Sequence, residues 1–430
     1  MAGYVFQRLG PGLRSNMAAG GGLVHAPEGG AGGGAADALA PFPPLLRKDG
    51  SPLCILQLVP ALEQGGVERG ALDIARAIVA AGGRALVASR GGRMEARLDR
   101  AGGELVRLDI GAKSPLSIWR NARALAKLAA AEGVDVIHAR SRAPAWAGLR
   151  AAQAAGIPFV TTYHGVHSEG FPGKRFYNSV MARGKPVIAV SEHVAAMIRE
   201  RHPFAKDIRV IHRGSDLAAF DPDAVSRERI EGLALRWGLV EDPRPVIALP
   251  GRLTRWKGQE EFIEAARILR EMRGAEDFLC LMIGGDETGP YAAELSRAIA
   301  DAGLENVARL AGSVDDMPAA LKLSAVVVSA SNKPEAFGRV ATEGMAMKRP
   351  VIATDHGGAQ ETVADGDTGW LIPPGDAGAL AGAMQKALSL TEAEAAAMGA
   401  AGRARVASMF SLQGMQEAVL GVYREVTRGR

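Results

Sequence analysis

From residue 53 onward, short apolar runs alternate with longer segments in which apolar residues recur every three or four positions. Runs such as CILQLV, VDVIHA and PFVTTY predict buried strands, whereas the apolar spacing at 67–80 and 118–131 predicts helices. Strands that are apolar throughout and separated by helices are typical of a parallel sheet with helices on both faces. The first half of the chain is therefore predicted to form a doubly wound α/β unit.

This alternation stops near residues 216–227, where Asp, Pro and charged residues replace the apolar runs, and then resumes with PVIALP, FLCLMI, AVVVSA and PVIATD. We therefore predict an interdomain linker there and two Rossmann-like doubly wound domains, at 51–218 and 225–409. The segment 410–430 has the apolar spacing of one further amphipathic helix. Ligands of such sheets bind beyond the carboxyl ends of the strands, so functional residues are expected in the loops that follow the strands.

The first 50 residues show neither the apolar runs of strands nor the three-to-four-residue apolar spacing of helices. Gly and Ala dominate 18–38, and the Pro-rich segment APFPPLL comes next. Because such a composition cannot bury enough apolar surface to offset the entropy of ordering, we predict that 1–50 is disordered. A translation start placed too far upstream explains the composition equally well, and Met17 is one alternative start.

Composition and charge narrow the class of protein. Hydrophobic residues make up 47% and charged residues 23%, which is typical of a soluble globular protein. A net charge of +4 suits an acidic substrate or an anionic membrane surface, but it is too small to indicate nucleic-acid binding. Cys54 and Cys280 lie in apolar runs without disulfide or metal-site spacing, so we expect buried thiols. Without a signal-peptide core or a bilayer-spanning apolar run, a cytoplasmic protein is expected.

Two loops carry residues suited to a phosphate-bearing ligand. Gly65 and Gly66 follow the first strand and open a helix, where glycines let backbone N–H groups approach an anion. Arg252 and Lys257 lie between the strand PVIALP and the helix from Gln259, and they can hold a diphosphate from two sides. A tight turn without a ligand and a solvated surface pair are the ordinary alternatives. The chain lacks a dinucleotide fingerprint after a strand and lacks a Walker A loop.

Glu335 and Glu343 form the third candidate, with seven residues between them. A predicted strand at 325–329 precedes them, so Glu335 is expected in the loop before a helix and Glu343 about two turns into it. Two carboxylates so placed can hold two parts of one elongated, hydroxyl-rich ligand. The backbone N–H groups from Phe337 to Val340 would point toward its phosphates. A capping acid with an ordinary surface glutamate is the alternative.

In combination, these motifs resemble the retaining glycosyltransferases of family 4, which have the GT-B fold. The resemblance rests on the E-x7-E element from Glu335 to Glu343 with Phe337 and Gly338 inside it, and on the Arg/Lys loop. Gly65 and Gly66 also match, and the likeness runs from about residue 53 to the end. It implies two Rossmann-like domains facing each other across a cleft, with the last helix crossing back to the first domain.

The resemblance also implies roles for single residues. Glu335 is expected to bond the ring hydroxyls of the donor sugar, and Glu343 the ribose hydroxyls of the nucleotide. Arg252 and Lys257 are expected to neutralise the donor diphosphate. Backbone that faces the sugar and phosphate would come from Phe337, Gly338, Arg339 and Val340.

Two further positions follow from the same resemblance. His164 in TTYHG comes directly after a predicted strand, where the family places a histidine near the donor sugar and the acceptor. Gly312 begins the loop that matches the family's nucleobase-reading backbone. The expected catalytic residues are therefore His164, Glu335, Arg252 and Lys257.

The reaction implied by the resemblance is transfer of a hexosyl group from a nucleoside-diphosphate sugar to a glycan or lipid-linked acceptor. Anomeric configuration would be retained, and no divalent metal or other cofactor is expected; Asp315 and Asp316 precede a Pro, as in a helix N-cap. Lipopolysaccharide or another cell-envelope glycan is the expected product. A catalytically silent nucleotide-sugar-binding subunit and a sugar-nucleotide epimerase of the same fold remain alternatives.

Basic residues of the first domain offer a hypothesis for the acceptor. They suit an anionic lipid-linked acceptor, or peripheral contact with an anionic membrane at the inner face of the cytoplasmic membrane. A solvated basic face explains them as well. These residues are Arg140, Arg142, Lys174, Arg175, Arg183 and Lys185.

Overall fold

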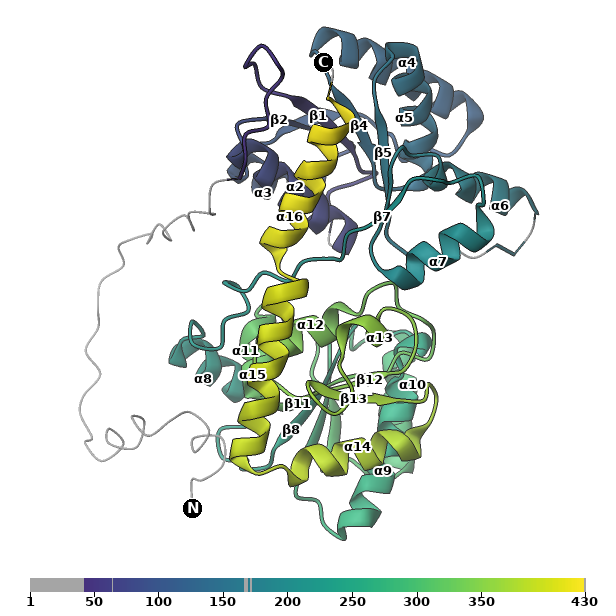
Figure 1. The fold of residues 1–430 in the computed structure, drawn as a ribbon. Helices are drawn as coiled ribbons and strands as arrows, with labels where there is room; N and C mark the ends of the chain where they lie inside the picture. Colours follow the sequence, from purple (N-terminus) through teal and green to yellow (C-terminus); the bar gives the residue numbers. More distant parts are fainter. Residues whose placement is uncertain (1–41, 64, 166–168, 171, 429–430) are drawn as a thin grey trace, which may run out of the picture.

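The computed structural model describes residues 42–63, 65–165, 169–170 and 172–428. Within these residues the chain forms two α/β domains placed one above the other, each built around its own parallel sheet (Figure 1). The two doubly wound sheets predicted from the alternation of apolar runs and helices are therefore confirmed.

The sheet of the first domain has the strand order β3-β2-β1-β4-β5-β6-β7, with all pairings parallel. Its strands are β1 (Cys54–Leu58), β2 (Arg84–Ser89), β3 (Glu104–Arg107), β4 (Val136–Ala139), β5 (Phe159–Tyr163), β6 (Val187–Ala189) and β7 (Ile208–Val210). Its helices are α2 (Gly66–Ala80), α3 (Glu95–Arg100), α4 (Pro115–Ala131), α5 (Arg142–Ala155), α6 (Pro172–Asn178), η2 (Ser179–Ala182) and α7 (Glu192–Arg201).

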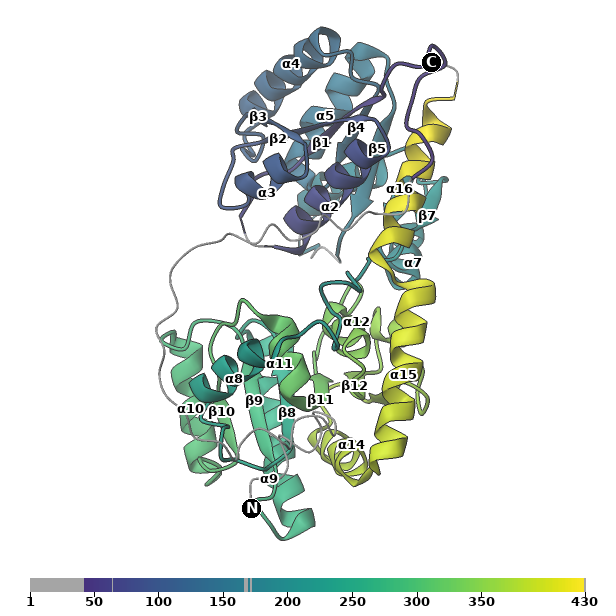
Figure 2. The same cartoon turned by 90° about the vertical axis from the view of Figure 1, so that its left-hand side faces the viewer.

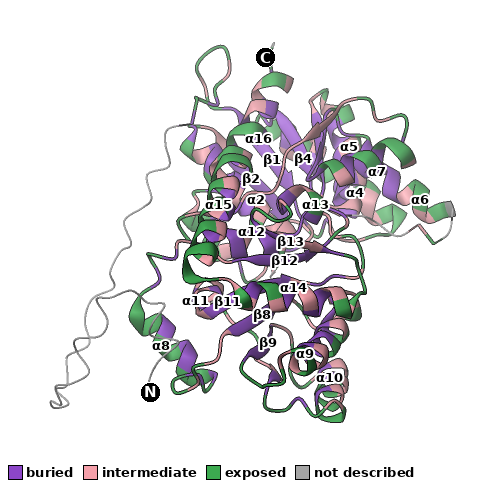
Figure 3. Cartoon of the chain, turned by 60° about the horizontal axis from the view of Figure 1, so that its bottom comes forward, coloured by how far each residue is buried: buried purple, intermediate pink, exposed green. Residues whose placement is uncertain are grey.

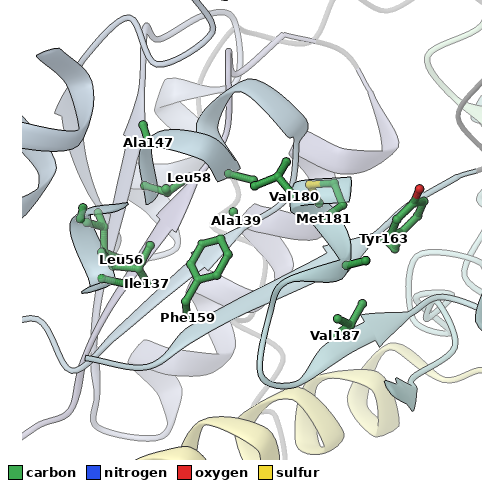
Figure 4. Packing of buried hydrophobic residues seen from close by; sticks show 14 of the residues in the cluster. Leu56, Leu58, Ile137, Ala139, Ala147, Phe159, Tyr163, Val180, Met181 and Val187 are labelled. Carbon is green, nitrogen blue, oxygen red and sulfur yellow. The ribbon is translucent and has the colours of Figure 1, made fainter. Parts of the chain in front are cut away.

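Strand residues of this sheet are buried on both faces, because alternate side chains enter two different cores. Leu56 and Leu58 of β1 pack with α4, α5 and α7 on one face, whereas Ile55 packs with α2 and α3 on the other. Figure 4 shows the first of these cores, where the ring of Phe159 lies among aliphatic side chains. The continuous apolar runs in the sequence thus reflect burial on two sides.

The second sheet has the order β10-β9-β8-β11-β12-β13 and is also parallel. Its strands are β8 (Val246–Pro250), β9 (Leu279–Ile283), β10 (Ala308–Leu310), β11 (Ser324–Ser329), β12 (Val351–Thr354) and β13 (Gly369–Ile372). Its helices are α8 (Arg227–Arg236), η3 (Arg255–Lys257), α9 (Gln259–Arg273), α10 (Pro290–Asp301), α11 (Met317–Leu323), α12 (Arg339–Ala346), α13 (Ala359–Thr362), α14 (Ala377–Ser389) and α15 (Glu392–Met409). Figure 3 shows buried strands beneath helices whose outer faces are exposed.

The last helix, α16 (Leu412–Val426), continues beyond α15 and returns to the first domain (Figures 1 and 2). Leu420 and Tyr423 of this helix are buried in the core that α2 and β1 share. The Tyr423 hydroxyl lies 2.6 Å from His138 Nδ1 on β4, so a polar contact inside the core supplements the apolar packing. The chain therefore crosses between the domains twice, once before α8 and once between α15 and α16.

Residues 42–50 differ from the disorder predicted for 1–50, whose remaining residues lie outside the described part of the chain. Phe42 and Leu45 are buried against the first domain, and the Leu45 N–H donates to the Ala81 carbonyl at 2.8 Å. Arg47 forms an ion pair with Asp135 at 2.8 Å. The Pro-rich composition of this segment suggested disorder. Phe42 and Leu45 are nevertheless ordered, because they pack into the core formed by α2 and β1.

No helix in the described part of the chain is both long enough and apolar enough to cross a bilayer.

Candidate active site

Loops at the carboxyl ends of the strands in both sheets meet between the domains. Ala336, in the loop after β11, packs against the core of the first domain. Glu361 accepts hydrogen bonds from the backbone N–H groups of Glu192 and His193 at the start of α7, both at 2.8 Å. The two domains therefore touch where ligands of doubly wound sheets bind.

Glu361 also lies 2.9 Å from His212 Nε2, in the segment that links the domains. Burial opposes ionisation of this carboxyl group, but the hydrogen bonds from His212 and from the two α7 amides outweigh it and lower the pKa of Glu361. A charged carboxylate at the N-terminus of a helix is stabilised by the helix dipole. The contact of Glu361 with α7 therefore stabilises the packing of the second domain on the first.

Lys257 and Glu335 are brought together by the pairing of β8 with β11. Lys257 Nζ lies 2.6 Å from Glu335 Oε1, and their side chains are only 13% and 17% exposed. The Ser331 hydroxyl donates to the same carboxylate oxygen. The candidate diphosphate cation and the candidate sugar-binding acid thus occupy one partly buried position.

The Lys257 loop reaches this position through Gly258. This residue has a φ of 79°, and a Cβ there would lie 1.9 Å from the Ala330 carbonyl oxygen. A side chain is therefore excluded, and the turn between η3 and α9 can press against the end of β11.

Arg252 lies in the same loop but is exposed. Its carbonyl accepts from Gln259 Nε2 at 3.0 Å, which holds the backbone in place. Among the described residues, its guanidinium group has no hydrogen-bond or ion-pair partner. The structure thus leaves this cation available to a ligand.

The start of α12 carries the second acid. Gly338 precedes the helix with a left-handed φ of 86°, and none of the described side chains caps the first N–H groups. Uncapped N–H groups at a helix N-terminus favour an anion such as phosphate. Arg339, the first residue of α12, forms an ion pair at 2.6 Å with Glu343, which lies one turn further along the helix. Sequence reasoning assigned only backbone contacts to Arg339, although the i,i+4 spacing of an arginine and a glutamate was a readable signal.

His164 and Gly66 both contact Arg213, a residue that the sequence analysis did not single out. Arg213 of the linker donates to the Gly66 carbonyl at 2.9 Å and lies 3.1 Å from His164 Nδ1. A guanidinium can only donate, so Nδ1 accepts and a neutral His164 ring carries its proton on Nε2. Burial lowers the pKa of Arg213 to about 10, which leaves it charged at neutral pH. No local pattern marks this arginine, because its partners are Gly66 at the start of α2 and His164 directly after β5, both far from it in sequence.

Gly312 lies at the other side of the second sheet. Its carbonyl accepts from the Gly284 N–H at 2.8 Å, which places it beside the loop after β9. Two strands, β9 and β8, separate β10 from β11. Three steps of about 4.8 Å span roughly 14 Å, so Gly312 and Glu335 can only be joined by an extended ligand.

The basic residues expected at the acceptor do not form one cluster. Arg140 is buried and donates to Gln57 Oε1 at 2.8 Å, and Arg142 donates to Asn178 Oδ1 at 2.8 Å. Arg183 and Lys185 precede β6, whereas His164 follows β5. In a parallel sheet, residues before a strand lie at the opposite edge from residues after one. The hypothesis that Arg183 and Lys185 lie near the acceptor loops is therefore wrong.

Comparison with known proteins agrees with this architecture. The family model "Glycosyltransferase Family 4" matches residues 64–219, and "Glycosyl transferases group 1" matches residues 235–405. The crystal structure of a glycosyltransferase from Rickettsia africae ESF-5 is 35% identical and covers 88% of this chain and 100% of that chain, with a TM-score of 0.81. Anabaena Alr3699/HepE in complex with UDP and glucose is 26% identical, covers 86% and 98%, and has a TM-score of 0.73. These likenesses define a protein of the GT-B fold.

A curated relative is the GDP-mannose-dependent alpha-(1-6)-phosphatidylinositol monomannoside mannosyltransferase of Mycolicibacterium smegmatis. It is 35% identical over 44% of this chain and 49% of its own length, so the chain spans about half the length of this relative. Together with the matched family models and the rickettsial structure, this shows that the chain belongs to the family 4 glycosyltransferases.

Proposed function

We propose that this protein transfers a hexosyl group from a nucleoside-diphosphate sugar to a glycan or lipid-linked acceptor. The observation that carries the proposal is the contact of Lys257 with Glu335 at 2.6 Å, beside the uncapped start of α12 and against the first domain. A cation, a sugar-binding acid and free helix amides are the groups that a sugar diphosphate requires.

The donor would lie along the carboxyl edge of the second sheet. Its nucleobase sits near Gly312 and its ribose at Glu343. The diphosphate lies between the Arg252/Lys257 loop and the N–H groups of residues 337–340, so that the sugar reaches Glu335. The strand spacing supports this layout, because it requires a ligand extended over roughly 14 Å.

The chemistry follows from the leaving group. Breaking the bond between the anomeric carbon and the phosphate oxygen leaves negative charge on the nucleoside diphosphate and positive character on the sugar. Arg252, Lys257 and the α12 amides are preorganised to stabilise the developing negative charge. The acceptor hydroxyl attacks from the face that the diphosphate leaves, its proton passes to the departing phosphate oxygen, and configuration is retained. We propose that these cations serve in place of a divalent metal.

His164 would orient the sugar and the acceptor. Because Arg213 donates to its Nδ1, a neutral His164 ring carries its proton on Nε2, and we propose that this group donates to a hydroxyl oxygen of the substrate. We propose that Gly65 and Gly66 face the donor from the first domain. A side chain at either position would meet the end of the Glu68 or Arg213 side chain within 3 Å.

The proposal also covers the acceptor, the pathway and the cellular location. We propose an envelope glycan such as lipopolysaccharide as the product, made in the cytoplasm with peripheral contact to an anionic membrane. The name of the mycolicibacterial relative, which specifies a phosphatidylinositol monomannoside acceptor, supports a lipid-linked acceptor. No nucleic-acid partner is proposed.

The deciding experiment begins with thermal shifts of the full chain against UDP-, GDP- and ADP-sugars. The donor that stabilises the protein is then incubated with and without lipid-linked acceptors, and products are followed by mass spectrometry and by the anomeric proton coupling. Transfer with retained configuration supports the proposal. A donor that binds without transfer or hydrolysis would indicate a silent subunit, and conversion of the donor to its epimer without acceptor would indicate an epimerase.

A further inference from the structure

A cavity of about 330 Å³ lies on the linker side of the domain interface. Helices α2 and α3 form one wall, and the linker around Arg213 and the starts of α12 and α16 form the others. Its volume is at the lower end of the range for small-molecule sites. It adjoins the proposed donor site through Gly66 and Arg339, which line it, whereas Lys257, Glu335 and Gly312 are not among its lining residues.

Arginines dominate the lining, and they come from both domains and the linker. They are Arg69 and Arg76 of α2, Arg97 of α3, Arg213 of the linker and Arg339 of α12. Within the described part of the chain, the side chains of Arg69, Arg76 and Arg97 form no hydrogen bond and no ion pair. Arg69, Arg76 and Arg97 are exposed, and Arg339 already pairs with Glu343, so the lining keeps more positive than negative charge.

Acids balance this positive charge only in part. Among the described residues, the acids that line the cavity are Asp73 and Asp216. Asp216 Oδ1 already accepts from the N–H groups of Ala218 and Ala219, both at 3.1 Å. Burial raises the pKa of Asp73 to about 6, although Arg339 and Arg69 oppose this rise, so Asp73 is still mostly ionised at neutral pH. The cationic excess therefore persists at neutral pH.

We propose that this cavity binds a small soluble phosphomonoester and acts as an effector site on the linker. Phosphate oxygens accept bidentate hydrogen bonds from guanidinium groups, and one phosphate can be shared by arginines of both domains. Apolar side chains of Leu72, Met94 and Phe220 complete the wall and leave room for an organic part of the ligand.

Two of the arginines connect the cavity to the donor site. Arg339 pairs with Glu343, and Arg213 holds His164 and the Gly66 carbonyl. A phosphate that attracts Arg339 weakens its hold on Glu343 and frees that carboxylate for the ribose of the donor. Effector binding therefore lowers the KM for the donor, within the 5–150-fold range of ordinary coupling between sites. This coupling rests on the proposed function, whereas phosphate binding in the cavity does not.

Inorganic phosphate titrated calorimetrically into the full chain tests the site. Arg76→Gln and Arg97→Gln should each weaken phosphate binding at least about fivefold, because each removes one charge-assisted partner. The matched control is Arg100→Gln, on the same helix as Arg97 but outside the cavity, which should bind like wild type. Arg252→Gln, in the donor loop, should also retain this binding.

Three results would overturn the proposal. The first is phosphate binding unchanged in Arg76→Gln and Arg97→Gln but lost in Arg252→Gln, which places the anion in the donor site alone. The second is an equal loss in Arg100→Gln, which would indicate general surface charge. The third is binding to phosphatidylglycerol vesicles that depends on Arg76 and Arg97 while phosphate affinity does not, which would indicate a lipid headgroup.

The donor arm is measured separately. Phosphate should strengthen the binding of the nucleoside diphosphate that stabilises the protein about fivefold or more in wild type, and not in Arg97→Gln. Unchanged nucleotide affinity with phosphate bound in the cavity would overturn the effector role. If no nucleotide binds at all, the proposed function fails, while the phosphate titration still decides whether the cavity is an anion site.

Discussion

Replacing the two cations of the donor loop with alanine should separate catalysis from stability. Lys257 is held against Glu335 at 2.6 Å, with side chains 13% and 17% exposed. Arg252 is exposed and, among the described residues, its side chain has no partner. The proposed function makes both residues bind the diphosphate, but only Lys257 also has a structural contact to lose.

The expected magnitudes follow from these contacts. Each alanine variant should lower kcat by about 10² to 10³, as for loss of one preorganised group facing a developing negative charge. In transition-state free energy this is about 3–4 kcal/mol. Arg252→Ala should change the free energy of unfolding by about 0.5 kcal/mol or less. Lys257→Ala should cost about 1–3 kcal/mol, because Glu335 then keeps, within the described part of the chain, only the Ser331 hydroxyl as a side-chain partner.

Urea denaturation followed by circular dichroism measures the stability difference, and steady-state transfer with the identified donor measures kcat. Arg255→Ala is the matched control, because Arg255 lies in the same loop but pairs with Glu260 and Glu294. It should retain near wild-type kcat. Near wild-type kcat in both Arg252→Ala and Lys257→Ala would refute a diphosphate site in this loop. Equal stability of these two variants would refute the energetic argument from the ion pair.

Three further predictions concern the acids and the last helix. Glu343→Ala should mainly raise the donor KM, because the ribose changes little during reaction, whereas Glu335→Gln should lower kcat; steady-state kinetics separates them. Tyr423→Phe leaves His138 Nδ1 without its partner at 2.6 Å and should cost about 1–3 kcal/mol in urea denaturation; no loss would show that the contact is dispensable. Burial lowers the pKa of His138 well below its usual value, so below about pH 6.5 the unfolded chain binds the extra proton. Stability should therefore fall as pH drops, by up to about 1.4 kcal/mol per pH unit from this group, and His138→Gln should show a shallower slope.

Several features of this protein could be predicted from local patterns. Strands such as β1 are apolar throughout because alternate residues enter two cores, and this is visible as a continuous apolar run. Glu335, Glu343, Arg252 and Lys257 were found because each follows a strand that the pattern identified. The direction of a parallel strand then places such residues at one edge of the sheet.

Contacts that depend on distant segments could not be predicted in this way. Arg213 meets His164 only because the linker passes the carboxyl ends of β1 and β5. Leu45 is buried only because α2 and β1 provide an apolar surface for a segment whose own sequence does not predict order.

The sequence by itself thus determined the fold class, which depends on periodicity, and its motifs carried the resemblance to the family 4 glycosyltransferases. The donor-binding residues that it predicts were selected by their positions relative to strand ends. Only the tertiary structure decided that Lys257 pairs with Glu335 and that five arginines surround one cavity at the linker. Strand order and domain packing set the distances between segments far apart in the chain. Charges that are separate in sequence therefore become one site only when both sheets, the linker and α16 are in place.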